Sequence, residues 1–467
     1  MTELSGSFKA AAAGVVPQSP AVPTLIMVVG LALTWLALPS ADAESIFDTA
    51  AIGVGVALAA ATAVEALAGV RALIRTDNLM LWVFYGLTLL EFLFPQPDVN
   101  TSVGVDAATR GTGIVLLAFF GLVMGRHLVA TRANPVAPVD FKPGHLFALF
   151  VFAFLVGYLH IFIAVNFDPI EMITQMARPR FTQPWGRGKL GDISALLYEL
   201  NLLIYLLPPI AGFMFARAKQ FSAIQKLFVI MVLGLTFFYA FASGTRNVIG
   251  TYVIAMFGAY VLSKPDLNLK RLLIVGIPLT ALLLFVSTLM LELRSAGGIG
   301  SLANDQRQYN TLYIDHNMVN ISNLTNVFPD AVDYLGLEIP FQSIIKPIPR
   351  ALWPGKPEGL STSIEAALGS FDGVTTLACT FAGEAYMAFG FAGVLIAGLI
   401  FGAAAGWWNQ VGQDRNSSFS QILYASGFLC AAMSMRSLLT MVPFMLPTLA
   451  MWIIGKFWLP KAGAQVR

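Results

Sequence analysis

Cationic side chains recur in the polar segments that separate the long apolar runs of this chain, and their type suits phosphate. A guanidinium group is planar, stays charged and can donate two parallel hydrogen bonds to one phosphate. Fixed cations of this kind can hold an anionic group and neutralise negative charge that builds on it during a reaction. The candidate phosphate ligands are Arg178, Arg180, Arg187, Arg246, Arg294, Arg350, Lys356 and Arg436.

Three further residues are candidates for a general base that takes the proton from an attacking hydroxyl group. They are Glu384, Glu199 and His316, the last within the polar sequence YIDHNM. A base works best when its pKa lies near the ambient pH, and partial burial moves a carboxyl group in that direction. We therefore predict that catalysis, if the chain has any, uses one of these three residues.

The stretch PRALWPGKP, residues 349–357, concentrates prolines, a tryptophan and two cations in an otherwise apolar chain. Proline this dense cannot continue a helix, and it leaves a loop little conformational entropy to lose on ordering. The interpretation from sequence is a stiff loop near the membrane surface, anchored by Trp353, that holds Arg350 and Lys356 over the headgroup layer.

Composition places these residues in a membrane protein. The chain is 57% hydrophobic and 12% charged, with a mean hydropathy of +0.73, whereas soluble domains run near a quarter charged. The net charge of +2 gives no reason to expect a nucleic-acid partner.

The apolar runs predict an all-α integral membrane protein with about twelve transmembrane helices. The first run could also be a signal peptide, because Ala41-Asp42-Ala43 resembles a cleavage site, but the long preceding segment with Lys9 as its only cation favours a retained helix. The expected spans are 23–38, 46–70, 79–94, 111–130, 144–166, 193–216, 227–243, 247–263, 271–291, 382–408, 420–434 and 440–459.

Lysine and arginine in the short loops predict that both termini are cytoplasmic. The cations assigned to inner loops are Arg71, Arg75, Arg126, Arg132, Lys142, Arg217, Lys219, Lys226, Lys264, Lys270, Arg271 and Arg415. The expected organisation is a cytoplasmic tail (1–22), nine spans (23–293) with a basic outer loop (168–192), a large periplasmic loop of short helices (294–380), three spans (381–459) and a second cytoplasmic tail (460–467).

Under this topology the ionisable residues of the spans gather toward the outer face, among them Glu91, His160, Glu199, Glu292 and Glu384. An ion channel or proton-coupled carrier would place charges at mid-depth as well. The outer layer instead suits a reaction at headgroup level on a lipid-linked substrate. The structural alternative is that each outer arginine pairs with an outer carboxylate.

Several stretches resemble the Wzy-type O-antigen polymerases, which join oligosaccharide repeat units. They are SGTRNVIGTYVIAMFGAYV (243–261), IPRALWPGKPEG (348–359) and TFAGEAYMAFGFAGVLIAGLIFG (380–402), in which the Glu384–Tyr386 pair precedes a Phe-Gly step. The similarity covers about residues 150–440.

The resemblance implies a glycosyltransferase related to the GT-C enzymes and the O-antigen ligases, in the bacterial inner membrane. Such an enzyme transfers a growing glycan from undecaprenyl pyrophosphate to the non-reducing end of an incoming lipid-linked unit, with no metal or other cofactor. The implied partners are the undecaprenyl-pyrophosphate-linked oligosaccharide, membrane lipid and a chain-length regulator protein. The family's outer-loop arginines would correspond to the seven arginines given above, and Tyr386 would join the substrate-binding residues.

Three alternatives stay open. A ligase would use the same chemistry with another acceptor. A lipid-linked oligosaccharide flippase would line a deep cavity with cations and would not need a large outer loop. A structural assembly protein would tolerate the loss of any single outer arginine.

Overall fold

The computed structural model describes residues 21–129, 141–178, 183–185, 197, 199–242, 246–264, 267–295, 314, 316–350, 352–357, 359–369, 377–412 and 417–458. These residues form helices and no strand, and every apolar run expected to be a span contains a helix. The long or apolar helices are α2 (Ala21–Leu36), α3 (Ala43–Ala66), α5 (Thr76–Thr88), α7 (Val105–Gly125), α8 (Pro143–Ala164), α11 (Leu207–Ala216), α12 (Ala223–Ala242), α13 (Arg246–Ser263), α14 (Leu269–Ser295), α18 (Thr380–Val411), α19 (Ser418–Arg436) and α20 (Met441–Trp458).

Six helical segments in the described part of the chain are long and apolar enough to cross a membrane, and four shorter apolar helices accompany them. The six are Ala43–Ala66, Val105–Gly125, Pro143–Ala164, Ala223–Ala242, Thr380–Val411 and Leu438–Gly455. The protein is therefore a membrane-embedded all-α protein, as predicted. The full number of twelve crossings stays a prediction.

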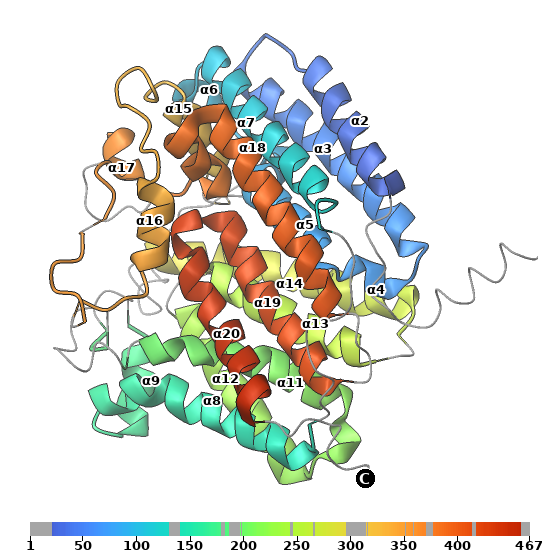
Figure 1. Ribbon diagram of the computed structural model, residues 1–467, viewed down its shortest axis with the longest axis vertical. Coiled ribbons are helices and arrows are strands. Elements are labelled where there is room, and N and C mark those ends of the chain that lie inside the picture. The colour runs from blue at the N-terminus through green and yellow to red at the C-terminus, as the bar shows by residue number, and fades with distance from the viewer. Residues whose placement is uncertain are drawn as a thin grey trace, which may run out of the picture.

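The shorter helices include α4 (Val70–Leu73), α6 (Val99–Ser102), α9 (Pro169–Met176), α15 (Asn317–Leu324), α16 (Glu338–Ile345) and α17 (Ile364–Ala367), with 3-10 turns η1 (Leu90–Leu93), η3 (Asn201–Leu206) and η6 (Leu438–Thr440). In Figure 1, α6, α9, α15, α16 and α17 lie along the left side of the molecule, whereas α4 lies on the right. We call the side with α6, α9 and α15–α17 the loop face.

The helices pack around two apolar cores. One core joins α2, α3, α5, α7, α15 and α18, and the other joins α8, α11, α12, α13, α19 and α20. Helix α18 packs closely on α7, because glycines at Gly121 and Gly398 let the two backbones meet; a Cβ on Gly121 would lie 2.9 Å from the Cα of Gly398. Small residues that allow such close approach are typical of helix pairs in membranes.

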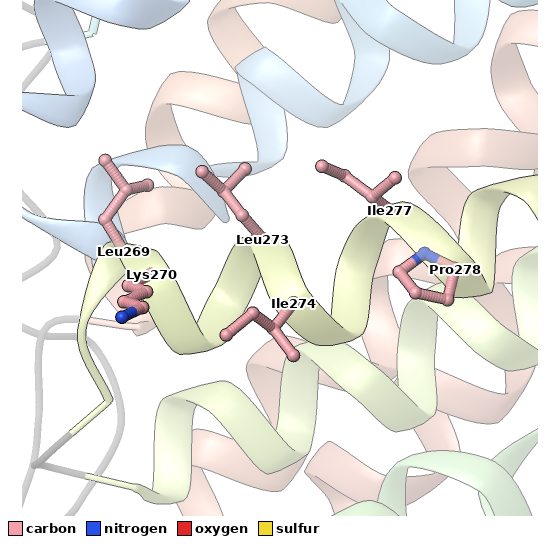
Figure 2. A pocket seen from close by; sticks show the side chains of 6 residues that line it. All are labelled: Leu269, Lys270, Leu273, Ile274, Ile277 and Pro278. Atoms are coloured by element: carbon pink, nitrogen blue, oxygen red, sulfur yellow. The ribbon is translucent and has the colours of Figure 1, made fainter.

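Helix α14 closes the back of the bundle and turns an apolar surface outward. Figure 2 shows Leu269, Leu273 and Ile277 projecting from one side of α14 and Ile274 from another, along a shallow depression that ends at Pro278. Leu273, Ile274 and Ile277 are all exposed. An apolar surface of this kind suits contact with lipid in a membrane-embedded protein.

Candidate functional site

The segment of the loop face that precedes α18 docks on the first half of that helix. Within α18, Phe389 and Gly390 leave helical geometry, with a positive φ of 61° at Gly390. The break frees backbone carbonyl groups, and Met387 O and Ala388 O accept hydrogen bonds from Leu335 N (2.8 Å) and Gly336 N (2.9 Å). The Phe-Gly step of the sequence is therefore the place where the loop face is attached to the bundle.

Tyr386, expected to bind substrate, strengthens the same attachment. Its hydroxyl group donates to the backbone oxygen of Phe328 at 3.1 Å, and the side chain is buried. Its ring meets the ring of Tyr334 edge-on at 5.9 Å. Tyr386 thus helps to hold the loop-face segment on α18.

Glu384, one of the three predicted bases, is buried where α18 meets the turn that follows Arg436. Its carboxylate oxygens accept hydrogen bonds from Ser437 Oγ (2.7 Å), Leu438 N (2.5 Å) and Leu439 N (3.2 Å). A carboxylate that accepts several hydrogen bonds from a turn fixes the course of that turn. The contacts of Glu384 therefore position Arg436, the last residue of α19.

His316, the second predicted base, lies beside a carboxylate that the sequence places far away. Its Nδ1 is 3.7 Å from Oε1 of Glu91, and the Glu91 side chain is buried. The other Glu91 oxygen accepts a hydrogen bond from Ile314 N at 2.7 Å. His316 adopts the left-handed conformation (φ 45°) directly before α15, and the next residue, Asn317, donates to Leu87 O at 2.8 Å. These contacts hold the His316 segment against the end of α5.

A cavity of about 310 Å³ lies between the two halves of the bundle, next to this pair. Its walls come from α5 and η1 on one side and from α13, α14 and α19 on the other. Polar lining is supplied by Asn247, Thr251, Thr280 and Arg436, and Ile314 closes the end near His316. Arg436 is half-buried there. The cavity thus brings one predicted arginine close to the segment that carries one predicted base.

Two other predicted arginines lie in the helices of this cavity. Arg246 begins α13 directly before the lining residue Asn247, and Arg294 follows the lining residue Met290 by one helical turn of α14. Their backbones therefore lie near the end of the cavity that Arg436 lines.

The remaining predicted residues lie elsewhere. Arg350 donates to Lys356 O (2.9 Å) and Pro357 O (3.4 Å), and the Lys356 ammonium group donates to Lys346 O and Ile348 O, both at 2.9 Å. These bonds tie the proline-rich loop to itself, and neither Arg350 nor Lys356 lines the cavity.

Arg178 is exposed two residues after the end of α9, and Glu199 lies two residues before the start of η3. Arg180 and Arg187 fall outside the described residues.

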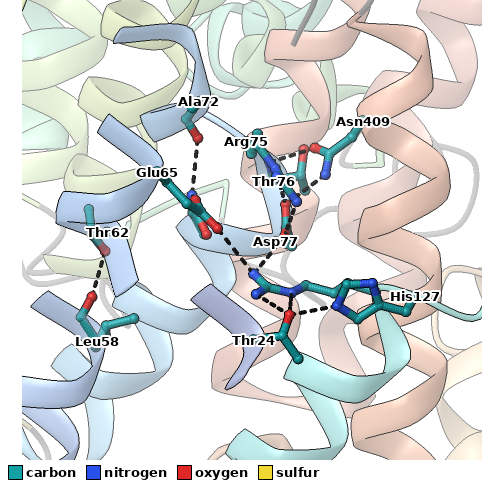
Figure 3. Close-up of polar contacts among 12 residues, drawn as sticks. Thr24, Leu58, Thr62, Glu65, Ala72, Arg75, Thr76, Asp77, His127 and Asn409 are labelled. Carbon is teal, nitrogen blue, oxygen red and sulfur yellow. Dashed lines mark hydrogen bonds and ion pairs between the residues drawn. The ribbon is translucent and has the colours of Figure 1, made fainter. Parts of the chain in front are cut away.

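Figure 3 shows a buried charge network at the other end of the bundle, which the sequence analysis did not predict. Asp77 pairs with Arg75 at 2.5 Å and with Arg126 at 3.2 Å, and Arg126 also reaches Glu65 at 3.4 Å. Arg75 and Arg126, assigned from the sequence to inner loops, lie at the ends of α5 and α7 and are only 1% and 4% exposed. The only local sign is the spacing Arg75–Thr76–Asp77 at the start of an apolar run.

Polar neighbours extend this network across the bundle. Thr24 Oγ1 accepts from Arg126 and lies 2.6 Å from His127 Nε2. Asn409 of α18 donates to Asp77 at 2.6 Å, and its amide oxygen accepts from Tyr424 Oη of α19 at 2.8 Å. With two cations and two anions, the network is neutral and fixes the ends of several helices against one another.

Comparison with known proteins covers part of the chain. A model described as a domain of unknown function, DUF8712, matches residues 304–414. No curated protein and no solved structure matches. The matched stretch contains α15, α16, α17 and α18, which are the loop-face segment and the helix on which it docks.

Proposed function

We propose that this protein is a polysaccharide polymerase of the bacterial inner membrane with twelve spans and cytoplasmic termini. It transfers a growing glycan from undecaprenyl pyrophosphate to the non-reducing end of a lipid-linked repeat unit at the periplasmic face, which corresponds to the loop face. Support comes from the resemblance of three stretches to the Wzy-type polymerases and from a cavity that both Arg436 and Ile314 line. His316, which pairs with Glu91, lies in the segment directly after Ile314.

The cavity carries the proposal because its wall contains a cation, Arg436, and a residue, Ile314, of the segment that bears the candidate base His316. The cavity is walled by apolar helices, so charges in it are screened less than charges in water. Its partly polar lining and half-buried Arg436 suit a diphosphate, and His316 lies two residues from Ile314 in its wall. Arg246 and Arg294 would supply further positive charge from the ends of α13 and α14.

In the proposed reaction a hydroxyl group of the acceptor sugar attacks the anomeric carbon at the reducing end of the donor glycan. A bond forms between that oxygen and the anomeric carbon, and the bond from the anomeric carbon to the diphosphate oxygen breaks. His316 takes the hydroxyl proton, and Glu91 orients the imidazole and stabilises its charged form. Polyprenyl diphosphate leaves with the bonding electrons, and Arg436 binds its developing negative charge.

The expected contribution of Arg436 follows from Coulomb's law. At about 4 Å and an effective dielectric constant of about 20, one pair of unit charges interacts by about 4 kcal/mol before desolvation. Loss of a comparable preorganised donor costs about 3 kcal/mol in known enzymes, which is roughly a hundredfold in rate. Arg436→Ala is therefore expected to lower the rate about a hundredfold, and Arg436→Lys, which keeps charge without the planar fork, should lower it less.

Glu384, Arg350 and Lys356 receive supporting roles in this proposal. Glu384 holds the turn after Arg436, and the other two stiffen the proline-rich loop through backbone carbonyl groups. A flippase is disfavoured because the buried cations Arg75 and Arg126 are paired with carboxylates and do not line the 310 Å³ cavity. A ligase would use the same residues and differs only in its acceptor.

The experiment is an assay of the purified protein in nanodiscs with a synthetic polyprenyl-diphosphate oligosaccharide. The proposal predicts a ladder of longer lipid-linked glycans and one released polyprenyl diphosphate for each bond formed. A ligase would form no ladder until its separate acceptor is added, and a flippase would move the substrate between leaflets without changing its length. Either result, in place of the ladder, would refute the proposed activity.

A further inference from the structure

Helix α16 lies at the level of a turn between two apolar helices. Ser343 Oγ donates to the backbone oxygen of Leu438 in η6 at 2.6 Å, and η6 joins α19 to α20. Ile339, one helical turn before Ser343, is buried on the same side of α16. One face of this short helix is thus packed against the protein at the height where the chain turns back.

The opposite face of α16 is apolar and exposed. Leu337, Phe341, Ile344 and Ile348 follow one another at spacings of four, three and four residues, which places them on one side of a helical path. Leu352 and Trp353 follow in the proline-rich loop. The exposed fractions of these six side chains run from 36% to 73%. We call this set the α16 stripe.

The cations of the proline-rich loop hold that loop against the C-terminal end of α16. The Lys356 ammonium group binds the carbonyl oxygens of Lys346 and Ile348, at the end of the α16 path. Arg350 binds the carbonyl oxygens of Lys356 and Pro357. Because of these bonds, the loop with Leu352 and Trp353 folds back beside Ile348, and the apolar side chains are flanked by basic residues.

From this geometry we infer that the α16 stripe inserts into the membrane interface on the loop face, at the boundary between headgroups and acyl chains. Fully burying each large apolar side chain contributes about 1.5–3 kcal/mol relative to water, so a stripe of this size favours an apolar environment. Amphipathic helices with basic flanks lie in the interface plane, and tryptophan is enriched at headgroup level. The contact of α16 with the turn between α19 and α20 puts this helix at the headgroup level of the membrane. We therefore expect lipid to cover the α16 stripe.

The test is spin-label accessibility in nanodiscs, with a label at Phe341→Cys and a matched label at Asp333→Cys, an exposed polar position shortly before α16. Both are made with Cys379 and Cys430 replaced by serine, and folding is checked by an unchanged melting transition. The Phe341 label should be relaxed mainly by oxygen, and the Asp333 label mainly by a water-soluble nickel chelate. Equal access of the chelate to both positions would overturn the inference. Exclusion of both reagents at Phe341 would also overturn it, because that result indicates a protein partner or a second copy.

A second measurement needs no substitution and covers the case in which the cysteine-free chain does not fold. In nanodiscs, hydroxyl-radical oxidation of Phe341 and Trp353 should be several-fold slower than that of Tyr334, which is 38% exposed and lies outside the stripe. Phe341 and Trp353 are 45% and 37% exposed in the protein alone, so comparable oxidation of all three residues would contradict insertion.

Discussion

Asparagine at position 77 is expected to destabilise the protein strongly, because Asp77 is the centre of the buried network. Its oxygens accept from Arg75 Nε (3.0 Å) and Nη2 (2.5 Å), Arg126 Nη1 (3.2 Å) and Asn409 Nδ2 (2.6 Å). Asp77→Asn leaves two buried guanidinium groups facing Glu65 alone and turns one acceptor into a donor. Breaking a buried pair from one side costs about 3–5 kcal/mol, which exceeds the effect of a surface charge change.

The assay is thermal or denaturant unfolding followed by tryptophan fluorescence in detergent or nanodiscs. We expect the melting temperature of Asp77→Asn to fall by about 3–5 °C. The matched control is Asp98→Asn, at an exposed aspartate before α6, which should change the free energy of unfolding by less than about 0.5 kcal/mol. A second control, Asp77→Asn combined with Arg75→Gln, restores neutrality and should recover part of the loss. The network does not hold these helices together if Asp77→Asn has the melting temperature of the wild type. The same conclusion follows if the double variant is no more stable than Asp77→Asn.

Three further predictions concern the loop face and a helix start. Gly390→Ala should destabilise by about 1–3 kcal/mol in unfolding experiments, because φ is 61° there and the new Cβ would lie 2.7 Å from Tyr334 Oη; wild-type stability would mean that the break in α18 is not required. Glu384→Gln should cost about 1–3 kcal/mol because a neutral amide oxygen replaces the charged acceptor of two backbone N–H groups, and a neutral outcome in the same assay would contradict the assigned contacts. A hydrogen bond from Ser45 N lowers the pKa of Asp42 from its ordinary 3.8. The ionised Asp42 therefore contributes fully to the stability of the folded protein above pH 3.8, and this contribution is lost as the pH falls through the lower pKa of the folded state. The melting temperature of wild type should therefore drop more between pH 5 and pH 3 than that of Asp42→Asn, which keeps the cap without titrating; parallel curves would count against it.

The helices could be predicted from sequence because the length of an apolar run is a local property. The runs around 111–130 and 382–408 contain helices that meet the length and hydropathy needed for a span. The break at Gly390 also had a local sign, since glycine within a helix tolerates a positive φ. Such features need no knowledge of which segments meet.

The side-chain partnerships could not be predicted, because they join residues far apart in the chain. Glu91 meets His316, and Asp77 meets Arg126 and Asn409, only after the helices are packed. Arg75 and Arg126 illustrate the difficulty: a cation at the end of an apolar run looks the same in sequence whether it faces water or a buried carboxylate. Arg350 shows the converse, since its guanidinium group binds the carbonyl oxygens of its own loop.

The central claim is that the cavity at Arg436, and not the proline-rich loop, is where the diphosphate departs. Rates of chain growth on a synthetic polyprenyl-diphosphate oligosaccharide, measured in EDTA for wild type, Arg436→Ala and Arg350→Ala, test it most directly. The account predicts growth by wild type, a loss of about a hundredfold for Arg436→Ala, and a rate within a few-fold of wild type for Arg350→Ala. A wild-type rate for Arg436→Ala, or the larger loss for Arg350→Ala, would contradict it.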